Sequence, residues 1–153
     1  MIASTYREPR YFWERAYFEE RFSNTLKEIA RRSPNTKVII FGPIPRWDIS
    51  PQSTFFTSWR KAHDKNGVSV WQKAHRVDQY DELLTNQAKV YGYQFVSLWN
   101  VFCQNQMCLT RVGDSANDFI SFDYGHLSQA GSIYALNQAS NLILNDLGIA
   151  RTK

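Results

Sequence analysis

The sequence lacks several features that would define its class at once. It has no run of about 18 apolar residues, so no transmembrane helix is expected. Met1–Arg10 has no apolar core of the kind that signal peptides carry. Its two cysteines are too few for a disulfide scaffold or a four-cysteine zinc site. Heptads and internal repeats are also absent, which excludes coiled-coil and repeat architectures.

The composition that remains is typical of one globular domain. The chain has 153 residues, of which 43% are hydrophobic and 21% charged, close to the averages of globular proteins. Aromatic residues make up 15%, which is too many for a disordered chain. We therefore expect residues 1–153 to form a single domain with one main core.

Charge is distributed unevenly along the chain. Residues 1–76 hold 14 Lys and Arg against 7 Asp and Glu, whereas residues 77–153 hold 4 against 7. A basic half could meet nucleic acid or an anionic glycan. Between residues 7 and 32, however, Arg and Glu alternate, which favours a solvated helix face. No nucleic-acid-binding motif is present, so no nucleic-acid partner is predicted.

Hydrophobic spacing and turn residues predict strands that alternate with helices. Such alternation indicates an α/β fold with a parallel sheet and helices on both faces. The apolar positions of the last helix, Leu136, Ala139, Ile143 and Leu147, keep helical spacing. In order, we expect the end of a strand at Ile2–Thr5, a helix from Pro9 to about Arg32, a buried strand at Lys37–Phe41, an irregular excursion over 46–76, a helix over Asp78–Tyr91 that stops at Gly92, a buried strand at Tyr93–Trp99, a loop over Asn100–Phe122, and a helix over Leu127–Leu147.

The segment before the last helix carries the main candidate for chemistry. Asp123 and His126 are three residues apart, so one turn can bring their side chains together. A carboxylate beside an imidazole is the orienting half of a nucleophilic triad, because it fixes the tautomer of the histidine and stabilises its protonated form. The spacing alone also fits a capped helix start with an incidental surface histidine.

Additional residues around this pair resemble a known family. Asp123-x-x-His126-Leu127-Ser128 with Gly131, the strand and proline loop of Val38–Pro45, and the cysteine pair are similar to SGNH hydrolases. The closer resemblance is to SGNH domains fused to membrane O-acyltransferases that modify bacterial surface polysaccharides. It implies a partial SGNH-type, flavodoxin-like three-layer fold in the periplasm. It also implies a carbohydrate or acyl-ester substrate, a membrane acyltransferase partner domain, Asp123 and His126 as catalytic residues, and no cofactor or metal.

The resemblance covers only the second half of such a domain. The family's nucleophilic serine lies in a Gly-Asp-Ser block after the first strand, and the next two blocks supply the oxyanion hole. Met1–Arg7 falls where the third block should end, so the chain is expected to be truncated at its N-terminus and inactive alone. Gly113-Asp114-Ser115 is not expected to replace the serine, because no strand leads into it and no helix follows. The alternative function is a non-catalytic carbohydrate-binding or interaction fragment.

The remaining candidates keep alternatives open. Cys103 and Cys108 are interpreted as a disulfide on an exposed loop, with Cα atoms roughly 4.4–6.8 Å apart. A metal site, which would need two more ligands, and two free thiols are the alternatives. His63 and His75 are expected to be surface residues. A final group could bind a sugar or an anion, although aromatic packing is the favoured interpretation: Arg46, Trp47 and Trp59.

Overall fold

The structure, a computed structural model, describes residues 11–62 and 71–146. The strand expected at Ile2–Thr5 and the helix start at Pro9 lie outside these residues. The elements in chain order are α1 (Tyr11–Arg32), β1 (Ile39–Phe41), α2 (Pro51–Ala62), β2 (Trp71–Lys73), the 3₁₀ turn η2 (Asp78–Tyr80), α3 (Asp81–Val90), β3 (Gln94–Val96), α4 (Leu98–Phe102), β4 (Cys103–Gln104), β5 (Met107–Leu109) and α5 (Gln129–Asp146).

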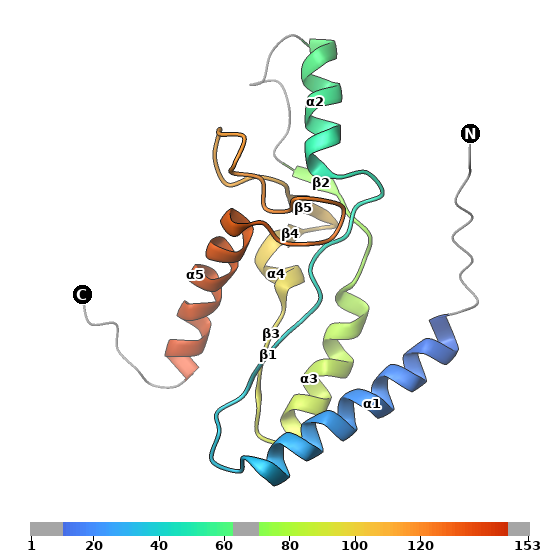
Figure 1. Ribbon diagram of the computed structural model, residues 1–153, viewed down its shortest axis with the longest axis vertical. Helices are drawn as coiled ribbons and strands as arrows, with labels where there is room; N and C mark the ends of the chain where they lie inside the picture. The colour runs from blue at the N-terminus through green and yellow to red at the C-terminus, as the bar shows by residue number, and fades with distance from the viewer. Residues whose placement is uncertain (1–10, 63–70, 147–153) are drawn as a thin grey trace.

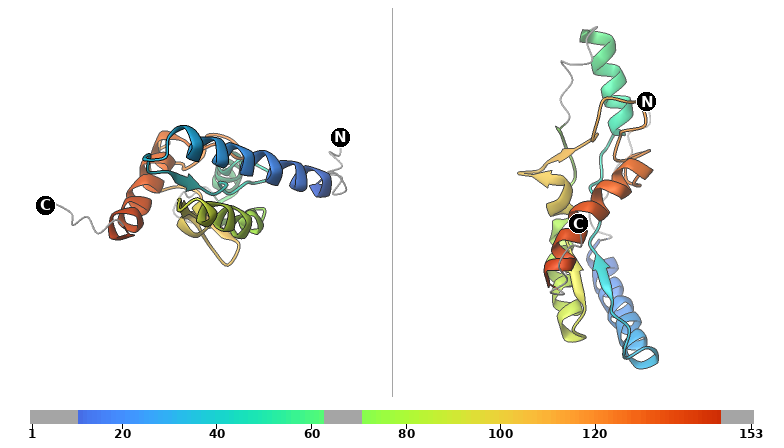
Figure 2. Two further views of the ribbon diagram at one scale, coloured as in Figure 1. Left: turned by 90° about the horizontal axis from the view of Figure 1, so that it is seen from below. Right: turned by 90° about the vertical axis from the view of Figure 1, so that its left-hand side faces the viewer.

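A short parallel sheet lies between two layers of helix. Strands β1 and β3 pair in parallel, with Ile40 opposite Phe95. Figures 1 and 2 show α1 and α3 on one side of this sheet and α5 on the other. Leu26 of α1 and Ala88 of α3 join Ile40 in one buried cluster. The α/β prediction with a short parallel sheet flanked by helices is therefore confirmed.

Both parallel strands are shorter and less buried than expected. Ile40 is 8% exposed but Phe41 is 40% exposed. Within the described residues β1 pairs only with β3, so Phe41 is not enclosed as in a central strand. The strand expected over Tyr93–Trp99 ends at Val96, because the Ser97 side chain accepts the backbone N–H of Asn100 and begins α4.

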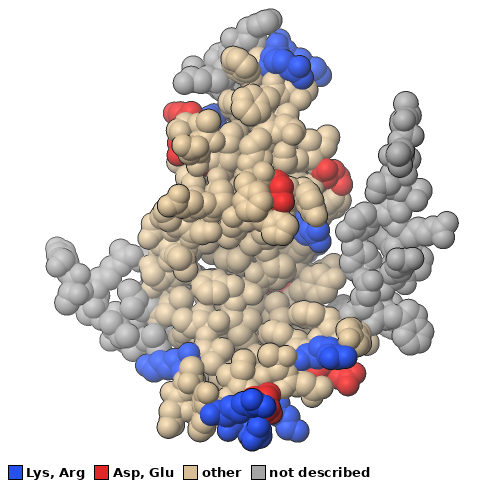
Figure 3. Space-filling model, viewed as in Figure 1, with Lys and Arg blue, Asp and Glu red and all other residues tan. Residues whose placement is uncertain are grey.

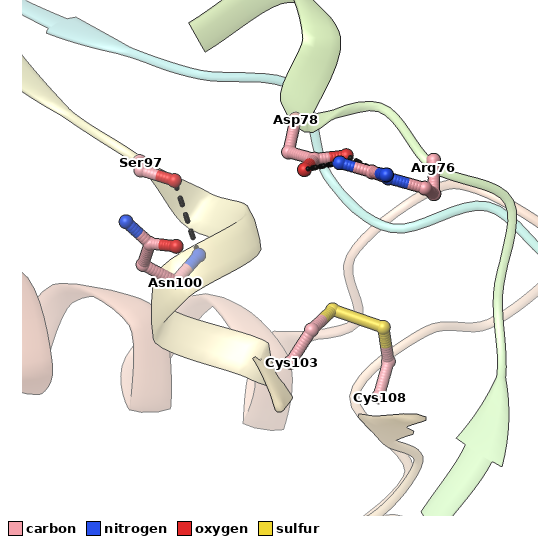
Figure 4. Close-up of a disulfide and its surroundings, with 6 residues drawn as sticks. All are labelled: Arg76, Asp78, Ser97, Asn100, Cys103 and Cys108. Atoms are coloured by element: carbon pink, nitrogen blue, oxygen red, sulfur yellow. Dashed lines mark hydrogen bonds and ion pairs between the residues drawn. A yellow bond between two sulfur atoms is a disulfide. The ribbon is translucent and has the colours of Figure 1, made fainter. Parts of the chain in front are cut away.

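The helix expected over Asp78–Tyr91 is divided into η2 and α3. Asp78 does not cap it. Instead, its carboxylate pairs with the guanidinium of Arg76 at 2.6 Å, as Figure 4 shows. Gly92 follows α3 with a φ of +67°, a conformation that glycine adopts without strain, so the predicted stop is confirmed.

Segments that were expected to be irregular contain regular structure. Residues 51–62 of the excursion form α2, which projects away from the parallel sheet in Figure 1. Strand β2 pairs antiparallel with β5, and β5 pairs with β4 in a hairpin inside the predicted loop. These strands are only two or three residues long. They are therefore too short to show the alternation that identifies a strand.

A disulfide joins the two strands of this hairpin. Cys103 and Cys108 are directly opposed and bonded, with Cα atoms 4.0 Å apart, slightly less than expected (Figure 4). The prediction of a disulfide is confirmed, but the prediction that it lies on an exposed loop is wrong. Cys108 is 0% and Cys103 is 8% exposed. They belong to a second core with the side chains of Trp47, Ala74, Val77, Leu98, Trp99, Phe102, Ile120 and Ala135.

Removing the disulfide should destabilise the chain. For a loop of this length, the chain-entropy relation gives a loss of roughly 2 kcal/mol in the free energy of unfolding. We expect this loss in urea unfolding of the double variant Cys103→Ser/Cys108→Ser. Reducing the unmodified chain with dithiothreitol is the matched control and should give a similar shift. If both treatments leave the urea midpoint unchanged, the bond makes no contribution to stability.

The charged residues of α1 form a solvated face, as the sequence predicted. Arg31 and Arg32 both pair with Glu28, at 2.6 and 2.5 Å, and all three side chains are well exposed. Figure 3 shows blue atoms gathered at the end of the molecule where α1 terminates, whereas the middle of this face is mostly uncharged. In the part of the chain that the structure describes, no helix is both long and apolar enough to cross a membrane.

Candidate active site

The candidate site lies where the loop before α5 meets the segment that follows β1. The backbone N–H of Trp47 donates to the carbonyl of Tyr124 at 2.9 Å. The side-chain amide of Gln52 donates to the carbonyl of Ser121. These bonds hold the loop at the carboxyl-end side of the parallel sheet, where α/β folds gather their ligands.

Asp123 uses both carboxylate oxygens within this loop. Its Oδ1 accepts the backbone N–H groups of Gly125 and His126, each at 2.8 Å. Its Oδ2 lies 2.7 Å from Nδ1 of His126. The contact expected between Asp123 and His126 is therefore present in the structure.

These bonds favour the ionised form of Asp123 and fix the tautomer of His126. The backbone N–H of Gly125, followed by the hydrogen bonds from His126, holds the pKa of the Asp123 carboxyl below its ordinary value. An ionised carboxylate can only accept hydrogen bonds, so Nδ1 of His126 carries the proton that it shares with Asp123. In neutral His126 the lone pair is then on Nε2, the arrangement that a general base requires.

Two aromatic side chains flank His126. The Phe122 ring stacks on the imidazole at 5.6 Å with an interplanar angle of 14°, and the Tyr124 ring meets it edge-on at 6.3 Å. All three side chains are exposed, with 64% of the His126 side chain accessible. The pair therefore presents an open face to solvent.

The start of α5 positions this loop. Ser128 is the N-cap, because its hydroxyl accepts the N–H of Gly131 at 3.1 Å, and it also donates to the carbonyl of Phe119. Its backbone N–H donates to the carbonyl of Ile120 at 2.9 Å. Gly131 lies so close to Ile120 that a Cβ atom would stand 2.7 Å from its carbonyl carbon. Ser128 and Gly131 thus fix the helix whose first turn follows His126.

The comparison with known families decides the identity of this arrangement. Residues 2–138 match the family described as the SGNH domain fused to AT3 domains. The chain belongs to this family. The SGNH resemblance inferred from Asp123, His126 and their neighbours is thereby confirmed.

A solved structure is similar to this SGNH chain. It is the periplasmic domain of a lipopolysaccharide acetyltransferase from Salmonella ser. Paratyphi A, with a TM-score of 0.69 and 25% sequence identity. The match covers 80% of this chain and 48% of the Salmonella domain, so the chain spans about half the length of that domain. No curated protein sequence matches the chain.

The other candidate residues of this SGNH chain differ in where the structure places them, and Arg46 is exposed and lies beside Tyr124 and Gly125. Ser115 is in an exposed loop, where its hydroxyl accepts the N–H of Asn117 at 3.2 Å. No strand leads directly into that loop and no helix follows it at once, as expected. Trp47 is buried at 4% exposure, which confirms packing rather than stacking, whereas Trp59 is 44% exposed. His63 lies outside the described residues.

Three further residues were placed incompletely or missed. His75 is a surface residue, as expected, but its Nε2 pairs with Asp48 at 2.6 Å. Arg111 is 7% exposed and lies 5.1 Å from the Phe55 ring, a buried cation that no local pattern indicated. Ala139 of the predicted apolar face of α5 is buried, but Leu136 is 58% exposed and the neighbouring Ala135 is buried, so the buried face is rotated from the predicted one. Small residues fit on the buried face of α5 because this helix lies close to the backbone of Ile120.

The described residues offer no site for a metal ion. Among residues 11–62 and 71–146, no three His, Cys, Asp or Glu side chains gather as ligands would. The cysteines are bonded to each other.

Proposed function

We propose that this SGNH chain supplies the base and the orienting carboxylate of an O-acetyltransferase or esterase site that acts on carbohydrate hydroxyls. The 2.7 Å contact between Nδ1 of His126 and Oδ2 of Asp123 carries this proposal. In it, His126 is the general base and Asp123 holds the histidine tautomer. A serine from a segment that precedes the matched half of the domain serves as nucleophile.

The proposed reaction proceeds in two balanced steps. The serine oxygen forms a bond to the acyl carbonyl carbon while its proton passes to Nε2 of His126. The ester bond of the donor then breaks, and the leaving oxygen takes that proton. In the second step a sugar hydroxyl, or water in an esterase, attacks the acyl-serine and gives its proton to Nε2. The serine leaves and regains a proton from His126.

The proposed setting is the periplasm, in partnership with a membrane acyltransferase domain of the AT3 type. The disulfide between Cys103 and Cys108 supports this location, because disulfides persist in oxidising compartments. The family description supports the partnership, because it names fusion to AT3 domains. The Salmonella domain, described as periplasmic, supports the location.

The release of p-nitrophenol from its acetate ester tests the proposal. We expect the chain alone to remain at background, because the nucleophile in this proposal comes from a segment outside the matched half of the domain. A longer chain that includes an upstream Gly-Asp-Ser block should gain activity that requires both that serine and His126. Loss of either group typically leaves only about 10³–10⁴-fold over the uncatalysed rate.

Two results would contradict the proposal. One is a robust rate of the chain alone that Ser115→Ala abolishes, since this would make Ser115 the nucleophile. The other is an active longer chain that keeps its rate after His126→Ala. In that case the contact between Asp123 and His126 would have a structural role only.

A further inference from the structure

Arg46 is a cation beside the proposed catalytic pair. Its guanidinium carbon lies 5.4 Å from the centre of the Tyr124 ring. Its side chain runs along Gly125, where a Cβ atom would stand 3.3 Å from Nε of Arg46. Gly125 directly precedes His126. Within the described residues no carboxylate forms an ion pair with Arg46, whereas four other arginines each have such a partner: Arg31, Arg32, Arg76 and Arg111.

The backbone around Arg46 is fixed from both sides. The carbonyl of Arg46 accepts the N–H of His75 at 2.7 Å, and the next N–H, that of Trp47, donates to Tyr124 at 2.9 Å. The Trp47 side chain is anchored in the core. The exposed guanidinium of Arg46 therefore extends from a rigid segment, which limits the entropy that it would lose on binding a ligand.

The neighbouring aromatic rings offer a complementary surface. Phe122 is 64% and Tyr124 is 48% exposed, although both are large side chains. Ring faces of this kind contact the apolar C–H face of a sugar, while a guanidinium forms paired hydrogen bonds with a carboxylate or phosphate. Together these groups combine apolar stacking with recognition of an anion.

We infer that Arg46, Phe122 and Tyr124 form an acceptor subsite for an acidic glycan, a sugar that carries a carboxylate or a phosphate. The inference rests on the proposed function, because it names the acceptor class of that site. The sugar ring lies on the aromatic side chains and its anionic group binds the Arg46 guanidinium. Its hydroxyl is then near His126.

The binding preference of the chain tests this inference without catalysis. The isotope-labelled chain is titrated by NMR with methyl glucuronide, glucose 1-phosphate, methyl glucoside and inorganic phosphate. A charge-assisted hydrogen bond corresponds to about ten-fold in affinity. We expect one or both acidic sugars to bind about ten-fold more tightly than methyl glucoside, with shifts at Phe122, Tyr124 and His126. Comparing methyl glucuronide with glucose 1-phosphate shows whether the subsite prefers a carboxylate or a phosphate.

Three variants locate the effect. Arg46→Gln should abolish the preference, and Arg46→Lys, which keeps the charge but loses the planar fork, should retain part of it. Arg60→Gln is the matched control, because it removes the same charge from an exposed arginine of α2. It should leave the preference unchanged. The spectrum of the Lys variant also shows whether substitution at this position preserves the fold.

Several outcomes would overturn the inference. They are equal binding of acidic and neutral sugars, no binding of either, equal loss of preference in Arg60→Gln, and inorganic phosphate binding as well as glucose 1-phosphate. None of them affects the assay of the proposed catalytic function. Conversely, the chain could prefer acidic sugars while its longer form shows no activity. That result would support the subsite and contradict the proposed catalytic function.

Discussion

Replacing Gly131 with alanine should destabilise the chain by about 3 kcal/mol or more. Overpacking typically costs about 1–3 kcal/mol, and the upper end applies here because the added methyl group meets the backbone of Ile120. The N–H of Ser128 bonds to that same carbonyl, so α5 cannot retreat without losing this bond. Alanine is the better helix former by about 1 kcal/mol, which offsets only part of the cost. Urea unfolding measures the net change.

Gly113→Ala is the matched control for this effect. At Gly113 the added methyl group would meet the carboxylate of Asp118, the end of a side chain that can move. We expect a much smaller loss of stability there. An equal loss in both variants would show that the contact between α5 and Ile120 is not the cause. A stabilised Gly131→Ala variant would mean that helix propensity outweighs the contact.

Asp123→Asn should reduce acyl-transfer activity by about 10⁴-fold in a longer chain that contains the nucleophile. The substituted amide keeps an oxygen to accept the N–H groups of Gly125 and His126, so the loop should remain folded. Its NH₂ group would face Nδ1 of His126 and donate to it. The imidazole would then carry its proton on Nε2, where it cannot act as a base.

His75→Ala is the control, because His75 forms a second histidine–carboxylate pair with Asp48 at a similar distance. Its activity should equal that of the unmodified chain. The ¹⁵N shifts of the His126 ring provide an independent readout in the chain alone and should report the change of tautomer in Asp123→Asn. An unchanged rate in Asp123→Asn, or an equal loss in His75→Ala, would argue against the proposed roles.

The part of the fold that depends on local pattern was predictable from the sequence. The apolar spacing of α1, the Gly92 stop and the contact between Asp123 and His126 all lie within a few turns of chain. The antiparallel sheet was not predictable. Strands β2 and β5 pair over only three residues each, and more than 30 positions separate the paired residues in the sequence. Local propensity carries little information about such pairing.

The residues around the site also divide into those that a local pattern indicates and those that only tertiary structure brings together. Asp123 and His126 could be found because only three positions separate them, so one turn can bring their side chains together. Arg46 lies beside the site because the backbone bond between Trp47 and Tyr124 joins segments more than 70 positions apart. The sequence offered Arg46 as a candidate for binding a sugar or an anion, but its position beside His126 depends on tertiary structure. The exposure of Leu136 was missed for a similar reason, since helical spacing gives a face but not its packing partner.

The hydrogen bonds of Asp123 also bear on how such an active site can be assembled. Both carboxylate oxygens bind groups no more than three residues away. A loop this short closes at little entropic cost and quickly, so the contact between Asp123 and His126 can form before the bonds of Trp47 and Gln52 hold the loop in place. The remaining entropic cost of assembling the proposed site comes from ordering the segment that carries the nucleophile. The proposed base and its orienting group are thus brought together by local hydrogen bonds, whereas the proposed nucleophile depends on a segment outside this loop.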